Sequence, residues 1–212
     1  MYLSKQDIEQ LSRIRRLNII NSVTGIKPAN LIGTQSADGG ENLAIFSSVV
    51  HLGSNPALIG LFFRPQHENP RDTYLNIKAT GVYTINQVPA HLAENAHYTS
   101  AKFPSQVSEF ERCGFNKEYL FDFKAPFVKE SHLKMGLELI DEVPIKANKT
   151  ILMIGSIQHL QFPDDMMDTE GNLNMTAIDA VGISGVNSYY SLQRTDQFPY
   201  AHVKSVPDFK PQ

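Results

Sequence analysis

Near the N-terminus, an apolar residue recurs at every third position from Ile8 to Leu17. This spacing is typical of one face of a helix. Ser4 and Asp7 precede the run and have the three-residue separation of a helix capping pair. The pattern therefore predicts a capped amphipathic helix over residues 4–21.

From Ala29 onward, the apolar positions form short runs of Ile, Val, Phe and Thr, separated by Gly, Pro, Asn and Asp. Such runs and breaks are typical of strands and turns. The strands that we expect are Ala29–Ser36, Leu43–Leu52, Leu58–Phe63, Val82–Val88, Leu133–Val143, Thr150–Phe162 and Ser188–Arg194. Between the first two, Asp38-Gly39-Gly40 favours a tight hairpin turn, because these residues tolerate positive φ.

Two regions interrupt the strands with helical patterns. Residues Pro70–Ala79 predict a short helix with Gly81 as its C-terminal cap. Residues Ala90–Cys113 predict one or two short helices joined by a loop around Pro104. The helical patterns do not alternate regularly with the strands, which argues against a doubly wound parallel sheet and favours an antiparallel barrel.

We therefore expect a single domain over residues 1–212, mainly β with α insertions. Its barrel core spans about residues 22–194, with the helix 4–21 before it and an extended tail, 199–212, after it. Neither the G-x-G-x-x-G nor the G-x-x-x-x-G-K-[ST] fingerprint occurs in the chain, so the sequence shows no dinucleotide or triphosphate motif.

Composition narrows the classes of function. The chain has 19 Lys and Arg against 22 Asp and Glu, a net charge of −3, which argues against bulk binding to nucleic acid. No stretch approaches the roughly 20 apolar residues of a membrane span. One cysteine, Cys113, excludes an internal disulfide, and the N-terminus lacks the order of a signal peptide. We expect a cytoplasmic protein that binds neither membrane nor nucleic acid.

The histidines do not have the spacing of a metal site. No two of them form an H-x-x-x-H pair, and none lies beside the cysteine, so we expect no metal ion. We interpret Cys113, next to Arg112, as a structural thiol, and the acidic loop 164–168 as a solvated turn. The seven histidines are His51, His67, His91, His97, His132, His159 and His202.

The segment Arg71-Asp72-Thr73 places a guanidinium and a hydroxyl at the start of the predicted helix. Because the first N–H groups of a helix have no internal partner, this arrangement can hold a phosphomonoester. The Asp72 charge would repel a phosphate unless Asp72 faces away as the helix cap. The alternative is a capped helix with a solvent-exposed arginine.

A further polar feature is the pair Ser47-Ser48 inside an apolar strand. Adjacent strand residues point to opposite faces. One of the two hydroxyls is therefore expected to face something polar.

Taken in order, these segments resemble the flavin reductase family of FMN-binding split barrels. The resemblance spans roughly residues 28–190 and rests on many short pieces at matching separations. The pieces are Pro28–Thr34, Asp38–Gly40, Asn42–Ser48, Asn55–Leu58, Arg71–Thr73 with Asn76-Ile77, Thr80–Asn86, Ser108–Phe110, Pro126–Ser131 and Ile154–Ile157. The resemblance implies an antiparallel Greek-key split β-barrel.

The resemblance also implies cofactor-binding positions. Thr34 matches the strand edge that meets the isoalloxazine, Ser47 and Ser48 with the neighbouring Val49 match the hydroxyl-bearing segment, and Arg71 and Thr73 match the phosphate clamp.

Two further positions follow from the resemblance. Arg64 would lie beside the cofactor and offer a cation for the negative charge near flavin N1; the alternative is a surface charge. Asn86 would lie near the flavin; the alternative is a residue that forms the turn at the end of its strand. The family's first strand commonly ends in two Thr, whereas this chain has Asn30 and only Thr34.

The implied activity is an NAD(P)H:flavin reductase, in which hydride passes from NADPH or NADH to N5 of FMN. No side chain of the protein is assigned a catalytic role. The resemblance further implies a homodimer with the flavin at its twofold interface, and the N-terminal helix and strand 133–143 are candidate dimer surfaces.

Two other interpretations remain open. One is a flavin-binding redox module without reductase turnover. The other is a split barrel that holds a different phosphate-bearing cofactor or haem.

Overall fold

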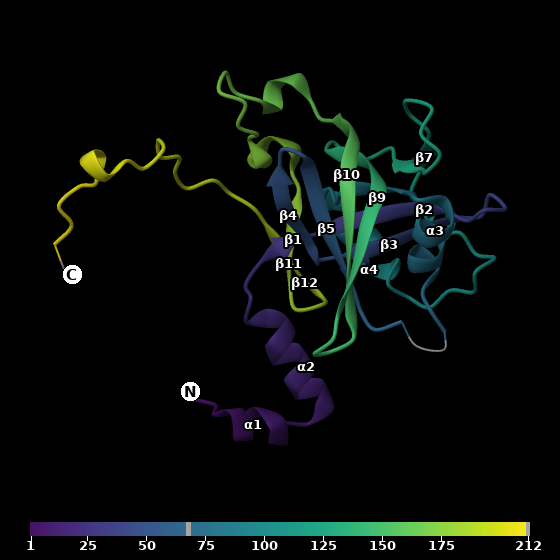
Figure 1. Ribbon diagram of the computed structural model, residues 1–212, viewed down its shortest axis with the longest axis horizontal. Coiled ribbons are helices and arrows are strands. Elements are labelled where there is room, and N and C mark those ends of the chain that lie inside the picture. Colours follow the sequence, from purple (N-terminus) through teal and green to yellow (C-terminus); the bar gives the residue numbers. More distant parts are fainter. Residues whose placement is uncertain (67–68, 211–212) are drawn as a thin grey trace.

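The computed structural model describes residues 1–66 and 69–210. Seven strands of this part form one antiparallel sheet in the order β3-β2-β6-β9-β10-β5-β4 (Figure 1). They are β2 (Asn30–Gln35), β3 (Glu41–Phe46), β4 (Val49–Ser54), β5 (Ala57–Phe63), β6 (Val82–Gln87), β9 (Lys134–Ile145) and β10 (Thr150–Gln161).

The large sheet curls around a shared core. Apolar side chains from β2, β5, β6, β9 and β10 belong to one buried cluster, together with Ile77 of helix α3 (Asp72–Thr80). Strands β3 and β4 stand at opposite ends of the strand order, yet only Ser47 and Ser48 separate them in the chain, so the two edges of the sheet lie close together and the arrangement is barrel-like. The expectation of an antiparallel barrel with α insertions is confirmed.

Two smaller sheets flank the barrel. Strands β1 (Lys27–Pro28), β11 (Val181–Ser184) and β12 (Ser188–Ser191) form the first, and β7 (Lys117–Glu118) and β8 (Phe127–Val128) form the second. The sequence pattern missed β11, and it extended the last strand to Arg194 whereas β12 ends at Ser191.

The prediction of one continuous N-terminal helix is wrong, because the structure has two helices there, α1 (Lys5–Gln10) and α2 (Arg13–Ser22). Ser4 and Asp7 form the expected capping box. The chain turns at Leu11, whose ψ is 144°. The Arg16 guanidinium then donates to the Glu9 carbonyl oxygen at 3.0 Å, which satisfies a carbonyl at the end of α1.

The predicted strand 43–52 is also two strands. It breaks after Phe46, where Ser47 and Ser48 cross from β3 at one edge of the sheet to β4 at the other. The hairpin turn and the helix cap were predicted correctly: Gly39 has a φ of 95° in the turn, and Gly81 ends α3 with a φ of 75°.

The remaining helices are short. They are α4 (Ala93–Tyr98), α5 (Glu109–Arg112) and the 3₁₀ turns η1 (Ala90–Leu92), η2 (Asp164–Met166), η3 (Met175–Ile178) and η4 (Val203–Ser205). Two short helices within 90–113 agree with the sequence pattern. No helix within residues 1–66 and 69–210 is long and apolar enough to cross a membrane.

Candidate functional site

Helix α3 packs against β2 and β3, near the C-terminal end of β2. Arg71 precedes it as the N-cap residue with an extended backbone (φ −78°, ψ 145°), and no side chain caps the helix. The N–H groups of the first turn therefore remain available to an anion. Asp72 is the first residue of the helix and not its cap, which corrects the role that the sequence allowed for its charge.

A buried amide joins this helix start to the barrel. Asn42 Nδ2 donates to Thr34 Oγ1 and to Thr73 Oγ1, each at 3.0 Å, and Asn76 Nδ2 donates to Thr34 Oγ1 at 3.1 Å. Thr34 and Thr73 are 0% and 3% exposed. Since the Thr73 oxygen accepts from Asn42, its hydroxyl proton is free to be donated to a ligand.

The structure thus brings together Thr34 and Thr73, which the resemblance had suggested separately, and adds Asn42 and Asn76 between them. Asn42 and Asn76 were part of quoted motifs but had no role assigned. The available signal was an amide in the apolar strand β3, because a buried amide must find hydrogen-bond partners.

Glu109 is a second buried polar group beside this network. Its Oε2 accepts from the Leu43 backbone N–H at 3.1 Å, and the residue is 7% exposed. Burial raises the pKa of this carboxyl, and the nearby Asp72 charge raises it further, although the Leu43 hydrogen bond opposes the change. Glu109 therefore satisfies an N–H of the edge strand β3 next to Asn42.

Arg64 and Arg71, the two candidate arginines, are the first and last residues of the connection from β5 to α3. Gln66 Nε2 donates to the Arg64 carbonyl oxygen at 2.7 Å, and Gln66 Oε1 accepts from the Arg71 N–H at 2.9 Å. Both arginine side chains are exposed, and neither forms an ion pair within the described residues. Gln66, which the sequence did not single out, thus links the backbones of the two arginines at the end of β5 and the start of α3.

The Ser47–Val49 segment lies where the chain changes sheet edge. Ser48 Oγ donates to the Phe62 carbonyl oxygen at 2.8 Å, so this hydroxyl is used to hold β5. Ser47 is half-buried, and its hydroxyl forms no hydrogen bond in the part of the chain that the structure describes. Val49 packs against the barrel core. Ser47 is thus the residue of the segment whose side chain is available to a ligand.

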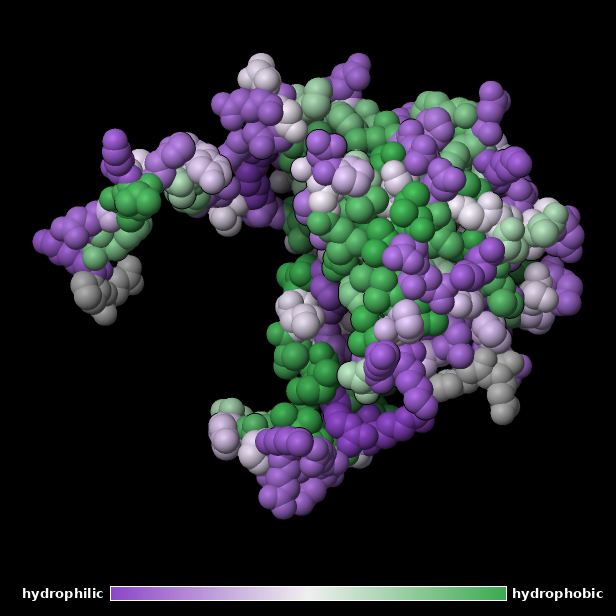
Figure 2. Space-filling model, in the orientation of Figure 1, coloured by the Kyte–Doolittle hydropathy of each residue, from purple (hydrophilic) through white to green (hydrophobic). Residues whose placement is uncertain are grey.

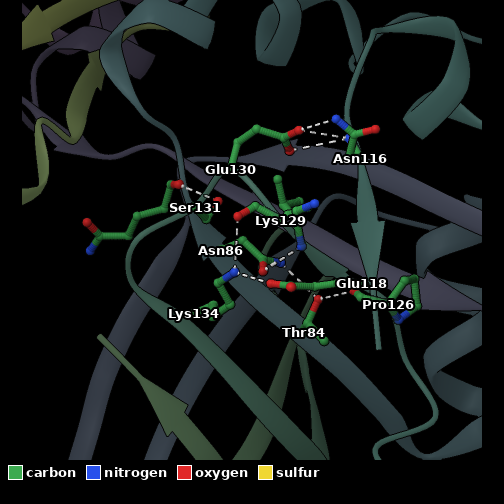
Figure 3. A network of polar contacts seen from close by, with 11 residues as sticks. Thr84, Asn86, Asn116, Glu118, Pro126, Lys129, Glu130, Ser131 and Lys134 are labelled. Atoms are coloured by element: carbon green, nitrogen blue, oxygen red, sulfur yellow. Dashed lines mark hydrogen bonds and ion pairs between the residues drawn. The ribbon is translucent and has the colours of Figure 1, made fainter. Parts of the chain in front are cut away.

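Asn86 lies apart from these residues, in the network that Figure 3 shows. Its Nδ2 donates to Leu31 O at 3.1 Å and Thr84 Oγ1 at 2.8 Å, and its Oδ1 accepts from Val128 N at 3.0 Å. The residue is 0% exposed. Its contact with a flavin stays a prediction, and the geometry favours a role in holding β8 against the barrel.

The same network contains a buried cation. Lys134, 4% exposed, forms an ion pair with Glu118 of β7 (Figure 3). Because a buried charge without a partner is costly, this pair holds the β7–β8 hairpin in place. It is a structural ion pair and leaves no free charge for chemistry.

Within the described residues, no group of three His, Cys, Asp or Glu side chains could hold a metal ion. His67 lies outside these residues. Cys113 is buried, and burial raises the pKa of its thiol with a further contribution from Glu109, so Arg112 does not activate it.

Around the start of α3 lie backbone N–H groups, the Thr73 hydroxyl and the exposed Arg71 guanidinium, together with the carboxylate of Asp72. The N–H groups, the hydroxyl and the guanidinium are suited to an anion such as a phosphate monoester, and the Asp72 charge opposes them. This set of groups does not contain the paired acid and base of a hydrolase. A redox reaction at this site would therefore use electrons carried by a bound cofactor.

Comparison with known proteins agrees with this geometry. Residues 26–177 match the family model described as "Flavin reductase like domain". A crystal structure of a split barrel domain protein from Shewanella frigidimarina NCIMB 400, provisionally named a flavin reductase, superposes with a TM-score of 0.91 at 46% identity and covers 95% of this chain and 100% of that one.

Two more distant structures share the fold. Nitrilotriacetate monooxygenase component B from Bacillus cereus has a TM-score of 0.81 at 16% identity, over 93% of this chain and 98% of that one. The 2-nitrobenzoate 2-nitroreductase from Pseudomonas fluorescens has a TM-score of 0.77 at 20% identity, over 100% and 99%. The expected Greek-key split barrel is thereby confirmed.

Proposed function

We propose, since this chain belongs to the family of the flavin reductase like domain, that it binds FMN and acts as an NAD(P)H:flavin reductase. Membership makes the protein a flavin-related oxidoreductase. The choice of FMN goes further and rests on one observation: uncapped N–H groups, Arg71 and the Thr73 hydroxyl all belong to the start of α3, where they would bind its phosphate. The nicotinamide donor follows from the family's name as a reductase and is part of the proposal.

The chain's own residues would bind and orient the cofactor. Arg71 would pair with the phosphate, and the first N–H groups of α3 would donate to it. Thr73 would donate its free hydroxyl proton while Asn42 holds its oxygen at 3.0 Å. Because Asn42 also holds Thr34 of β2, the phosphate end and the strand edge would keep a constant separation.

When bound, FMN would supply the redox chemistry by accepting a hydride from NADH or NADPH at N5. This step requires no acid or base from the chain, which agrees with a site made of binding groups. Arg64, whose backbone is linked to that of Arg71 through Gln66, would supply a positive charge for the negative charge that reduction creates near N1.

The proposal includes a homodimer with the flavin at its twofold interface and a cytoplasmic location. The shape of the chain supports the homodimer, because both of its ends extend away from the barrel (Figure 1) and could contact a second copy. A twofold interface is the commonest way for two copies to associate.

The visible spectrum of the purified protein tests the proposal. We expect flavin absorbance near 450 nm, either as isolated or after addition of FMN, and bleaching by NADH or NADPH under anaerobic conditions. A colourless protein that takes up no FMN would overturn it.

The same measurement separates the alternatives. Reduction by dithionite but by neither nicotinamide at millimolar concentration would indicate a redox module without turnover. A maximum near 410 nm would indicate haem or a pyridoxal-type cofactor in place of flavin.

A further inference from the structure

The two N-terminal helices do not pack against the barrel core. Neither α1 nor α2 contains a buried residue in the described chain. On α2 and the residues after it, Ile14, Ile20, Val23 and Ile26 are 73%, 47%, 69% and 51% exposed. A ten-residue helix is marginal in water unless an apolar face is covered. Most of the apolar surface of α2 is therefore left uncovered by the described part of its own chain.

The C-terminal segment 195–210 has the same property. Its large apolar residues recur at short intervals and are between 60% and 93% exposed. Among the described residues, the backbone hydrogen bonds of this segment are local ones, such as Ser205 N to His202 O. The residues are Phe198, Tyr200, Val203, Val206 and Phe209. The tail thus carries several uncovered aromatic side chains.

The two segments face a common space. Figure 2 shows a hollow bounded by the C-terminal segment, the body of the molecule and α1–α2, with apolar side chains along the α2 flank. In Figure 1 the strands at this side of the body include β4 and β12. Val50 and Leu52 of β4 and Tyr190 of β12 are 38%, 42% and 44% exposed. The C-terminal segment, α2 and the strands on this side of the body thus all carry exposed apolar side chains.

The solvent-accessible surface area of the chain indicates how much surface a partner could cover. The chain exposes 13886 Å², whereas a compact monomer of 23.7 kDa exposes about 9,800 Å². The excess of about 4,000 Å² is more than each subunit buries in a typical dimer, which is about 800 Å², or about 1,000–2,500 Å² in an obligate one. The excess is thus large enough for the interface of an obligate dimer.

We propose that a second copy of this chain occupies the hollow, and that residues 195–210 form an arm which lies on the partner. This inference deepens the homodimer of the proposed function by assigning its contact surfaces. In a twofold dimer the exchange is reciprocal, so each copy gives one arm and receives one. The arm contributes Phe198, Tyr200 and Phe209, and the receiving surface is the apolar side of α2 with β4.

A second copy fits better than an unrelated partner because each chain carries both an apolar arm and an apolar concave face. When two copies exchange arms about a twofold axis, both arms and both faces are covered at once. A membrane surface or a different protein would cover the arm or the face but would leave the geometry of the hollow unexplained.

Sedimentation of the full-length protein at micromolar concentration tests the second copy. We expect a species of twice 23.7 kDa. The variant Phe198→Ser/Tyr200→Ser/Phe209→Ser should raise the dimer dissociation constant roughly 100-fold or more, because buried aromatic anchors dominate interface energies. The matched control Lys204→Ser/Asp208→Ser/Lys210→Ser changes the same arm without removing apolar area and should stay within about threefold of the parent. A full-length monomer, or equal constants for the two variants, would overturn the inference.

Arm exchange has its own readout. A photo-crosslinking phenylalanine analogue placed at position 200 should give a covalent product of twice the chain mass. Crosslinks confined to a single chain would show that the arm folds back on its own body, and would overturn the exchange.

The flavin content of the same samples keeps the two proposals separate. A dimeric, crosslinking protein that takes up no FMN leaves the arm exchange standing while the reductase proposal fails. A yellow, reducible protein whose crosslinks stay within a single chain leaves the reductase proposal standing while the arm exchange fails.

Discussion

The side-chain amide of Asn42 lies 3.0 Å from the hydroxyl oxygen of Thr73, 31 positions further along the chain, and the same nitrogen lies 3.0 Å from Thr34 Oγ1. This single group joins β2, β3 and the first turn of α3. Together with the Asn76–Thr34 hydrogen bond, this amide fixes the position of the helix start relative to the barrel.

Replacement of Asn42 by Ala should destabilise the fold. Thr34 and Thr73 would each lose a buried partner, at a cost of about 1–3 kcal/mol in the free energy of unfolding. Urea unfolding measures the effect. Asn18→Ala, on the exposed side of α2, is the control and should change stability by less than about 0.5 kcal/mol. Equal unfolding midpoints for the two variants would show that the network carries no stability.

Arg71→Ala should weaken binding of FMN and leave binding of riboflavin unchanged, because only FMN carries the phosphate. Charged hydrogen bonds contribute about 1.5–3 kcal/mol, which corresponds to about a 10- to 150-fold rise in the dissociation constant. Flavin fluorescence titration reports both constants. Lys124→Ala removes an exposed positive charge elsewhere and serves as the control. If FMN and riboflavin lose affinity equally, Arg71 does not contact the phosphate.

Glu109 should make the folded protein less stable as the pH rises. Its pKa in the folded state is raised above the usual value of 4.5, first by burial and then by Asp72. The folded state therefore keeps the proton over a range where the unfolded state has lost it, and stability falls as the pH passes upward through the raised pKa.

The variant Glu109→Gln can still accept the Leu43 hydrogen bond but does not ionise. We expect its unfolding free energy to be close to that of the parent at about pH 4. Toward pH 7 the unfolding free energy of the variant should increasingly exceed that of the parent. Thermal unfolding across this range gives the comparison. Glu111→Gln, exposed on the same helix, should leave the parent's pH dependence in place. A constant difference between Glu109→Gln and the parent at all pH values would contradict the prediction.

Gly33 should tolerate no side chain. A Cβ at this position would meet the Pro126 carbonyl oxygen and the Thr84 hydroxyl well inside van der Waals contact. Gly33→Ala should therefore cost about 1–3 kcal/mol, seen as a lower melting temperature. At Gly53 the nearest atom would be 3.4 Å away, an ordinary contact, so Gly53→Ala is the matched control. An unchanged melting temperature for Gly33→Ala would mean that the 126 segment moves freely.

Most local elements could be predicted because their signals lie within a few residues. The Ser4–Asp7 capping box, the turn at Gly39 and the end of α3 at Gly81 depend on hydrogen bonds and φ angles between near neighbours. The breaks at Leu11 and at Ser47-Ser48 could not be read in this way. The first depends on Arg16 reaching back to α1, and the second on which edge of the sheet each strand joins.

The candidate site shows the same division. Arg71 and Thr73 were accessible to sequence reasoning because a helix start with a cation and a hydroxyl is a local pattern. Gln66 and Glu109 were not, since the first acts by joining Arg64 to Arg71 and the second by binding Leu43 from a distant helix.

The sequence alone determined the strand-rich barrel, its short helices and the family, because alternation of residue types and motif order are properties of the chain itself. The tertiary structure decided which of the suggested residues meet: Thr34 and Thr73 do, through Asn42, while Asn86 hydrogen-bonds Leu31, Thr84 and Val128. It also decided that α2 and the C-terminal aromatic residues are uncovered. Burial and hydrogen-bond partners arise from contacts between distant segments, and no local pattern encodes them.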